Sequence, residues 1–100
     1  MKASIDGTVL AEAADSDLIS IEGNYYFPPS SLVPDLFSDS STAYRCPWKG
    51  DAHYRDVSAG GATHRDAAWS YDDLMASALE RVGSDFNGYV AFDPAQVSVA

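Results

Sequence analysis

The stretch TAYRCPWKGDAHY, from Thr42 to Tyr54, holds the only cysteine of the chain, followed directly by a proline, a tryptophan and a lysine. Proline suits the second position of a type I turn, and glycine suits a left-handed position at the end of a loop. Pro47-Trp48-Lys49-Gly50 therefore predicts a four-residue hairpin loop between two strands. The expected pairs, whose six side chains share one face of the hairpin, are Cys46 with Asp51, Tyr44 with His53 and Thr42 with Arg55.

Alternating apolar and polar residues predict further strands along the rest of the chain. Asp6-Gly7 is a two-residue hairpin signal within Lys2–Ala13. A strand in Asp17–Gly23 is expected to turn at Gly23-Asn24 and to return through Tyr25–Phe27. The remaining expected elements are strands at His64–Tyr71, Gly88–Phe92 and Gln96–Ala100, a flexible turn at Val57–Thr63, and a loop or single helical turn at Ser30–Ser41.

One segment, Tyr71–Phe86, has the apolar spacing of a helix. Asp72 or Asp73 is expected to start this helix, and Gly83 to end it. Its apolar stripe consists of Leu74, Met75, Ala78, Leu79 and Val82. About eight short, mostly antiparallel strands and one short helix near the C-terminal third predict a compact, mainly-β single domain. Such a domain is built either of two packed sheets or as a barrel-like form, with the helix covering one opening.

The composition excludes several classes of protein. The 100 residues suit one domain, and 46% hydrophobic with 21% charged residues is typical of a soluble globular protein. A net charge of −9 argues against nucleic-acid binding, which needs clustered Lys and Arg. No apolar run approaches the roughly 18 residues of a membrane span or the length of a signal peptide, so we expect no membrane partner and a cytoplasmic location. A single cysteine excludes an intrachain disulfide.

The acidic charge is spread unevenly along the chain. Ala43–Ser70 carries four cationic side chains and three carboxylates, a formal charge of +1, so the other 72 residues carry −10. A basic patch on an acidic protein attracts small anions better than it attracts long polyanions. We therefore expect a small anionic molecule as the partner. The alternative is that the arginines simply pair across strands, as Arg45, Arg55 and Arg65 with Asp51, Asp56 and Asp66.

Three residues are weak candidates for catalysis: Cys46, His53 and Asp66. A cysteine becomes nucleophilic when a nearby cation or histidine lowers its pKa, and Lys49 and His53 are candidate neighbours. The alternative is that Cys46 is a small buried hydrophobe at the end of a strand. The potential metal ligands lack the close pairs of a zinc site, and no Gly-rich phosphate loop is present. No metal and no cofactor are therefore expected.

The chain has more aromatic rings than a core of this size needs, and a pocket lined by rings with a few cationic groups is the usual form of a small-ligand site. We expect the site between the Cys46–Tyr54 hairpin and a strand on which Arg65, Ala67, Trp69 and Tyr71 share one face. The expected walls are Trp48, Tyr54, Trp69 and Tyr71. The groups expected to attract an anion are Lys49, His53, Arg55 and Arg65. The alternative is that the rings pack in the core and Trp48 folds back over it.

Four segments also occur in an order and spacing that resemble a known family: EGNYYFPPSSL (Glu22–Leu32), CPWKGDAHY (Cys46–Tyr54), DAAWSY (Asp66–Tyr71) and NGYVAFDPAQVSV (Asn87–Val99). Over nearly the whole chain they resemble the small bacterial and fungal family catalogued as domain of unknown function 427. The resemblance implies a compact, mainly-β fold of two sheets or a barrel-like form. The family sometimes carries a nucleotidyltransferase-like label, and no agreed catalytic residues come with it.

The leading hypothesis is a small-molecule binding or interaction module that takes an anionic ligand. The alternative is an enzyme acting on a phosphorylated or carboxylated small molecule, with Cys46 or His53 doing the chemistry and Asp66 orienting. A third hypothesis is a subunit that presents Trp48 to a partner protein. No oligomeric state is predicted.

Overall fold

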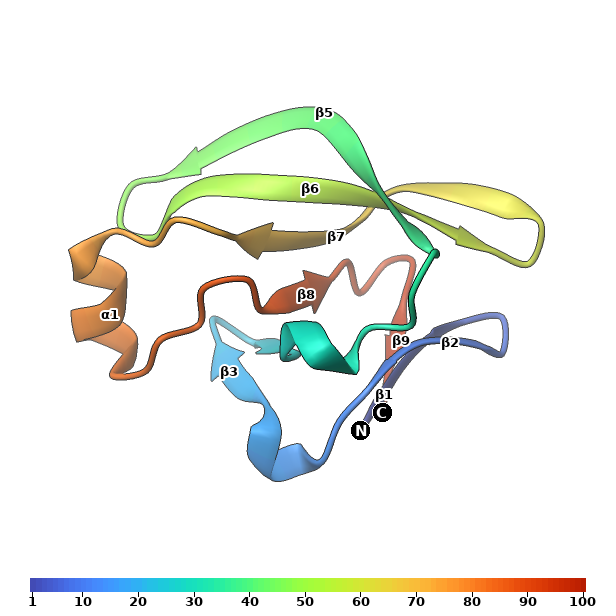
Figure 1. Cartoon of the computed structure of the whole chain (residues 1–100), viewed down its shortest axis with the longest axis horizontal. Coiled ribbons are helices and arrows are strands. Elements are labelled where there is room, and N and C mark those ends of the chain that lie inside the picture. Colours follow the sequence, from blue (N-terminus) through green and yellow to red (C-terminus); the bar gives the residue numbers. More distant parts are fainter.

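The three longest strands follow one another in the chain and form the main sheet. The computed structural model describes all residues from 1 to 100. In it, the main sheet consists of β5 (Phe37–Cys46), β6 (Gly50–Ala59), β7 (Ala62–Tyr71) and the short β8 (Val90–Phe92), antiparallel and in that order. The single helix, α1 (Ala76–Val82), lies at the end of the sheet where β5 turns into β6 (Figure 1).

Two smaller sheets lie on the other side of β8 (Figure 1). One contains β1 (Lys2–Ile5), β2 (Thr8–Glu12) and β9 (Ser98–Val99) in the order β2-β1-β9, and the other is the hairpin of β3 (Ile19–Ile21) and β4 (Asn24–Tyr26). Single 3₁₀ turns span Asp15–Asp17 and Pro29–Ser31. The two chain ends lie side by side, because the Lys2 N–H donates to the Ala100 carbonyl at 2.7 Å.

Nine strands in three antiparallel sheets with one helix confirm the predicted mainly-β fold. The sheets do not close into a barrel. No helix of the chain combines the length and the apolar character needed to cross a membrane.

Buried apolar side chains form two clusters. The larger joins the main sheet to the β2-β1-β9 sheet and contains Phe27 and Phe92, whose rings meet edge to face at 5.5 Å. The smaller lies beside α1 and contains Tyr26, Tyr71 and Phe86. The rings of Tyr26 and Phe86 are also edge to face, at 5.6 Å. This second cluster is the floor of the pocket described below.

Two tight turns use left-handed backbone. Asp6 and Gly7 have φ angles of 47° and 84°, as a type I′ turn requires, so the hairpin predicted at Asp6-Gly7 is confirmed. Between β3 and β4 the central residues are Glu22 and Gly23, with φ of 53° and 82°. The predicted turn at Gly23-Asn24 is therefore wrong by one residue, because Asn24 pairs with Ile21.

The loop between β5 and β6 is one residue shorter than predicted. Cys46 pairs with Gly50, so the loop consists of the three residues from Pro47 to Lys49. Gly50 has a φ of 118°, and a Cβ there would lie 3.1 Å from the Asp73 carbonyl oxygen. The glycine thus permits a close backbone approach and does not end the loop.

The one-residue difference reverses the faces of the hairpin, because successive side chains of a strand point to opposite sides. The observed pairs are Arg45 with Asp51, Tyr44 with Ala52, Ala43 with His53 and Asp39 with Arg55. The predicted pairs of Cys46 with Asp51, Tyr44 with His53 and Thr42 with Arg55 are therefore wrong. Tyr44 and Cys46 face one side of the sheet, while His53 and Arg55 face the other.

The helix begins later than predicted, although its end at Gly83 is confirmed by a left-handed φ of 79°. Strand β7 continues to Tyr71, and the Asp72 carboxylate is held by His53 and Ser70 at 2.8 and 2.7 Å. The Met75 N–H then donates to the Lys49 carbonyl at 3.0 Å. These tertiary contacts keep the segment before Ala76 out of the helix, so neither Asp72 nor Asp73 starts it.

Strand β7 does not have a single uninterrupted face. Val57 pairs with His64 and Arg55 pairs with Ala68, so three residues of β7 lie opposite Asp56. Asp66, in the middle of this bulge, has a φ of 53°, and its N–H donates to the Asp56 carboxylate at 2.8 Å. Bulges of this kind bend a strand and re-aim its side chains. In the region Ser30–Ser41, the observed 3₁₀ turn lies earlier than predicted, at Pro29–Ser31, and the residues from Phe37 onward already belong to β5.

Candidate functional site

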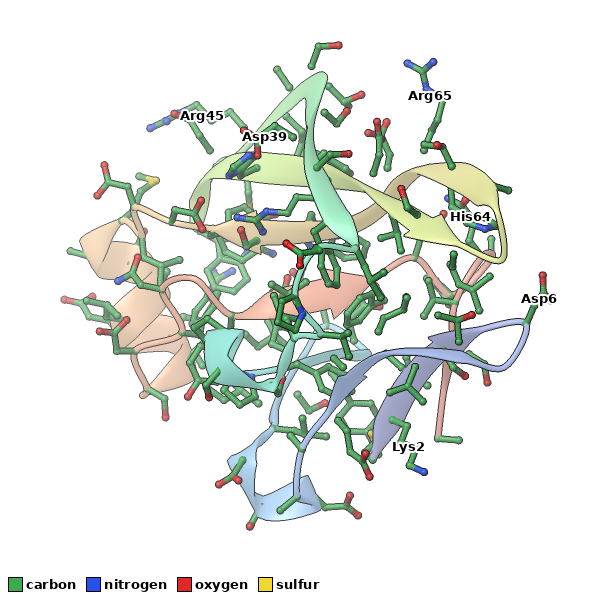
Figure 2. The ribbon with its side chains drawn as sticks, turned by 45° about the vertical axis from the view of Figure 1, so that its right-hand side comes forward. Lys2, Asp6, Asp39, Arg45, His64 and Arg65 are labelled. Carbon is green, nitrogen blue, oxygen red and sulfur yellow. The ribbon has the colours of Figure 1, made fainter.

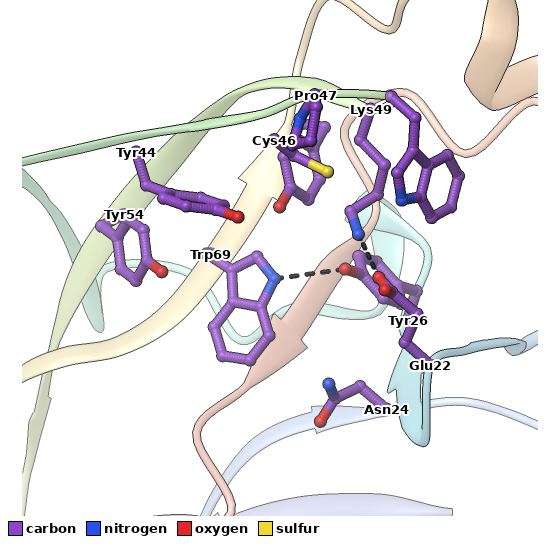
Figure 3. A pocket seen from close by; sticks show the side chains of 11 residues that line it. Glu22, Asn24, Tyr26, Tyr44, Cys46, Pro47, Lys49, Tyr54 and Trp69 are labelled. Atoms are coloured by element: carbon purple, nitrogen blue, oxygen red, sulfur yellow. Dashed lines mark hydrogen bonds and ion pairs between the residues drawn. The ribbon is translucent and has the colours of Figure 1, made fainter.

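A cavity of about 370 Å³ lies between the inner face of the main sheet and the β3–β4 hairpin (Figure 3). Ligand sites for small molecules have volumes of roughly 300–1,000 Å³, so this cavity is at the small end of that range. Its lining consists of Glu22, Asn24, Tyr26, Tyr44, Cys46, Pro47, Trp48, Lys49, Tyr54, Trp69 and Tyr71.

Strand alternation brings the rings of the main sheet into this cavity. Tyr54 pairs with Trp69 on the neighbouring strand, and Tyr71 pairs with the small Ala52. The rings of Tyr54 and Trp69 lie 6.1 Å apart at 34°. Figure 3 shows the hydroxyls of Tyr44 and Tyr54 turned toward the same space. Four of the cavity walls are therefore aromatic residues of three adjacent strands.

Lys49 is the only buried cation of the chain. Its side chain is 6% exposed, and its Nζ lies 4.4 Å from the centre of the Trp48 ring and 5.3 Å from that of Tyr71. The ammonium donates a hydrogen bond to the Glu22 carboxylate, the only acidic group of the lining. A buried lysine is rare unless it is paired, and an ammonium over an aromatic face is further stabilised by the ring quadrupole.

The environment keeps Lys49 charged. Burial alone would lower the pKa of Lys49, but the hydrogen bond to Glu22 and the electrostatic influence of Tyr26 and Cys46 outweigh it, so the pKa lies above its ordinary value. At neutral pH the cavity therefore contains a permanent ammonium. This charge can attract an anion, but it cannot act as a nucleophilic amine.

Two buried tyrosines add hydrogen-bond donors. Burial raises the pKa of Tyr71 and that of Tyr26, so both hydroxyls keep their protons at neutral pH. Tyr26 accepts a hydrogen bond from Trp69 Nε1 at 3.2 Å, which leaves its own proton free to be donated. Tyr71 is only 4% exposed and makes no side-chain hydrogen bond, yet no fully buried polar atom of the protein lacks a partner. Its hydroxyl therefore opens onto the cavity.

Cys46 lies at the end of β5 with its thiol turned into the cavity (Figure 3). The residue is 4% exposed and is a free cysteine. It belongs to the apolar cluster beneath the pocket, as the alternative of a buried hydrophobe requires, and it also lines the cavity.

His53 and Arg55 lie on the opposite face of the main sheet from the cavity. His53 Nε2 lies 2.9 Å from Asp39, and Nδ1 lies 2.8 Å from Asp72. Arg55 donates to Ser70 at 2.8 Å, and Ser70 donates to Asp72. This polar network ties β5, β6 and the end of β7 together. His53 and Arg55, which were expected to attract an anion beside the aromatic rings, therefore lie on the other side of the sheet from those rings.

The other two candidate residues of this region are also away from the cavity. Arg65 extends into solvent from the bulge of β7, far from Arg45 at the other end of the sheet (Figure 2). The Asp66 carboxylate accepts hydrogen bonds from Ser40 and Thr42, which lower its pKa. Cys46, His53 and Asp66 therefore occupy three different environments. Of the predicted ligand-binding residues, the structure brings together Trp48, Lys49, Tyr54, Trp69 and Tyr71.

Sequence reasoning did not identify the contribution of the β3–β4 hairpin. Glu22, Asn24 and Tyr26 form one side of the cavity, although they lie at least 20 positions before the CPWKG segment in the sequence. Their alternating pattern showed only that they belong to a strand and a turn. The resemblance segment beginning at Glu22 was the one signal that could have drawn attention to them.

A larger cavity of about 610 Å³ lies elsewhere, around the Asp15–Asp17 turn, and it contains no cationic side chain. Its lining consists of Ser16, Asp17, Leu18, Ile19, Pro28, Ser30, Ser84, Asp85 and Tyr89. Buried charge and converging aromatic rings occur together only in the smaller cavity. No three His, Cys, Asp or Glu side chains are arranged to hold a metal ion.

A family model described as a domain of unknown function (DUF427) matches residues 1–100. The chain belongs to this family. The match confirms the resemblance drawn from the four sequence segments. A search of curated proteins found no match.

In this DUF427 chain the segments that carry the resemblance converge on the pocket. Every lining residue except Tyr44 lies in Glu22–Leu32, Cys46–Tyr54 or Asp66–Tyr71. These segments come from two hairpins and one further strand, and only the fold places them together. Three of the four segments that carry the resemblance thus build the pocket, and the fourth, Asn87–Val99, does not line it.

Proposed function

We propose that this protein binds a small organic anion in the cavity around Lys49. The observation that carries the proposal is a buried, permanently charged ammonium that faces a cavity between aromatic rings. The anionic group would sit against Lys49, and the apolar part of the ligand would lie between Trp48, Trp69 and Tyr71. Ligand sites commonly combine apolar walls with a few polar groups that fix the orientation of the ligand.

The hydrogen-bonding groups of the cavity favour an oxyanion. The hydroxyls of Tyr26 and Tyr71 are protonated and have free protons, and Lys49 can only donate. A carboxylate or a phosphate offers several acceptors to such donors, and hydrogen bonds to an ionised acceptor are stronger than neutral ones. Carboxylate and phosphate share this chemistry, so the test below includes both.

Tryptophan fluorescence tests the proposal directly, because both tryptophans of the chain line the cavity. Benzoate, phenyl phosphate and the uncharged benzamide share one ring and differ in the polar group. We expect benzoate or phenyl phosphate to bind about tenfold more tightly than benzamide, and Lys49→Met to abolish this difference. Equal affinity for benzoate and benzamide, or an unchanged preference in Lys49→Met, would refute anion recognition by Lys49.

The free thiol of Cys46 favours a cytoplasmic setting as part of this proposal, because free thiols persist in reducing compartments. The thiol is also the one observation that favours the alternative of an enzyme, since it opens onto the cavity near Lys49. Iodoacetamide labelling at pH 7 distinguishes the two. Labelling faster than glutathione, with protection by benzoate, would support a nucleophilic Cys46, and a slower rate would support the binding module.

A further inference from the structure

Glu22 and Lys49 form an asymmetric pair. The Lys49 side chain is 6% exposed and is fixed by the Trp48 and Tyr71 rings, whereas the Glu22 side chain is 58% exposed. No other hydrogen bond holds the Glu22 carboxylate. The carboxylate can therefore move into solvent, while the ammonium stays in the cavity.

The backbone of Glu22 also differs from what its residue type favours. Its φ of 53° lies in the left-handed region, and Asn, Asp and Gly are the residues preferred there in a type I′ turn. From the tip of the β3–β4 hairpin, the Glu22 side chain reaches the Lys49 ammonium at the edge of the cavity (Figure 3).

We propose that Glu22 is a built-in competitor, a carboxylate that stays hydrogen-bonded to the Lys49 ammonium until a ligand displaces it. The ligand is a carboxylate with a single negative charge. This inference rests on the proposed function of the pocket. A bound ligand carboxylate takes the place of Glu22 on Lys49 and accepts a second hydrogen bond from the unpartnered Tyr71 hydroxyl. Glu22 makes only the first of these two contacts, so the ligand can exchange for it.

The released carboxylate determines which anions are accepted. After displacement, Glu22 remains tethered by the β3–β4 turn at the mouth of the cavity, with its negative charge unpaired. A dianion such as phenyl phosphate is repelled by this charge more strongly than benzoate, because like charges at short range disfavour each other. Glu22 therefore lowers the affinity for phenyl phosphate more than it lowers the affinity for benzoate.

Glu22→Gln tests the proposal, with Glu80→Gln as the matched control. Glu80 lies on the exposed side of α1 and makes no ion pair, and both variants change the net charge by the same amount. If the closed pair occupies about nine-tenths of the free protein, its removal tightens benzoate binding about tenfold. We expect this gain in Glu22→Gln, together with a larger gain for phenyl phosphate, and no change in Glu80→Gln.

Glu22→Asn keeps the test valid if Glu22→Gln folds poorly, since asparagine favours the left-handed turn. Equal or weaker benzoate binding in a folded Glu22 variant, with wild-type binding intact, would refute the competitor role and leave the proposed function standing. Absence of benzoate and phenyl phosphate binding in both the wild type and the variants would refute the two proposals together.

Discussion

At the scale of single residues, a substitution of Tyr71 distinguishes most clearly an effect on ligand affinity from an effect on the stability of the fold. Tyr71→Phe removes a hydroxyl that makes no protein hydrogen bond, so the free energy of unfolding should change by less than about 0.5 kcal/mol. Loss of a hydrogen bond to a charged ligand should weaken benzoate binding about tenfold. Urea unfolding and fluorescence titration measure the two effects, with Tyr25→Phe as the control outside this cavity. Unchanged benzoate affinity would mean that Tyr71 does not contact the ligand.

Asp72 predicts a pH dependence of stability. Burial alone would raise the pKa of Asp72, but hydrogen bonds from His53 and Ser70 and the Arg55 charge outweigh burial and lower it. Because the folded pKa lies below the unfolded value of about 3.9, the carboxylate stabilises the fold above that pH. Its contribution is lost as the pH falls through the folded pKa.

Asp72→Asn should therefore lower the free energy of unfolding at pH 7 by about 1 kcal/mol, a modest value because 46% of the side chain is exposed and solvent screens the charge. At about pH 3, below the unfolded value, the stability difference between the wild type and the variant should be smaller than at pH 7. Urea unfolding at the two pH values measures this, with Asp35→Asn as the control. A stability difference that is the same at both pH values would contradict the assignment.

At the scale of elements, the position of Gly50 fixes the β5–β6 loop and with it the direction of Lys49. Gly50→Ala brings a Cβ within 3.1 Å of the Asp73 carbonyl oxygen and forces alanine into a φ of 118°. Gly83→Ala is the matched control, because φ there is 79° and nothing lies within 4 Å of the added atom. We expect both substitutions to destabilise, with Gly50→Ala costing about 1–3 kcal/mol more. An equal loss in urea unfolding would show that the close approach to Asp73 is unimportant.

The same elements show which features the sequence could predict. Asp6-Gly7 and Gly83 were identified correctly, because each of these signals acts through backbone conformation within a few residues. The turn predicted at Val57–Thr63 was too wide, because β6 continues to Ala59 and β7 begins at Ala62. The pairing of Gly50 with Cys46 was not predicted. The close approach that requires a glycine there involves the Asp73 carbonyl, which is 23 positions away in the sequence. The start of the helix was predicted wrongly for a related reason. The Asp72 carboxylate forms a hydrogen bond with His53 on another strand and does not cap α1.

For the candidate site, too, features set by neighbouring residues were predicted, whereas features set by distant contacts were not. Local clustering correctly placed Trp48, Lys49, Tyr54, Trp69 and Tyr71 in one region, because they lie on one hairpin and its neighbouring strand. A one-residue error in register was enough to assign His53 and Arg55 to the wrong face. Glu22 could not be foreseen as the partner of Lys49, because only the packing of the β3–β4 hairpin against the main sheet brings them together.

At the scale of the whole molecule, the acidic surface and the cationic cavity act together. A net charge of −9 repels anions at long range, so only a ligand that reaches Lys49 gains a favourable contact. The two tryptophans belong to that cavity, one in the β5–β6 loop and one on β7. A small anion should therefore bind in this cavity, and on no other face of the main sheet.

A benzoate titration followed by two-dimensional ¹H–¹⁵N NMR tests that claim most directly. The spectrum should contain two tryptophan indole resonances, both from the cavity. We predict that both shift saturably with one dissociation constant, while the side-chain Nε–H resonances of Arg45 and Arg55 on the opposite face stay unchanged. Indole resonances that do not move while these arginine resonances do would contradict this prediction and indicate anion binding at the His53 and Arg55 network.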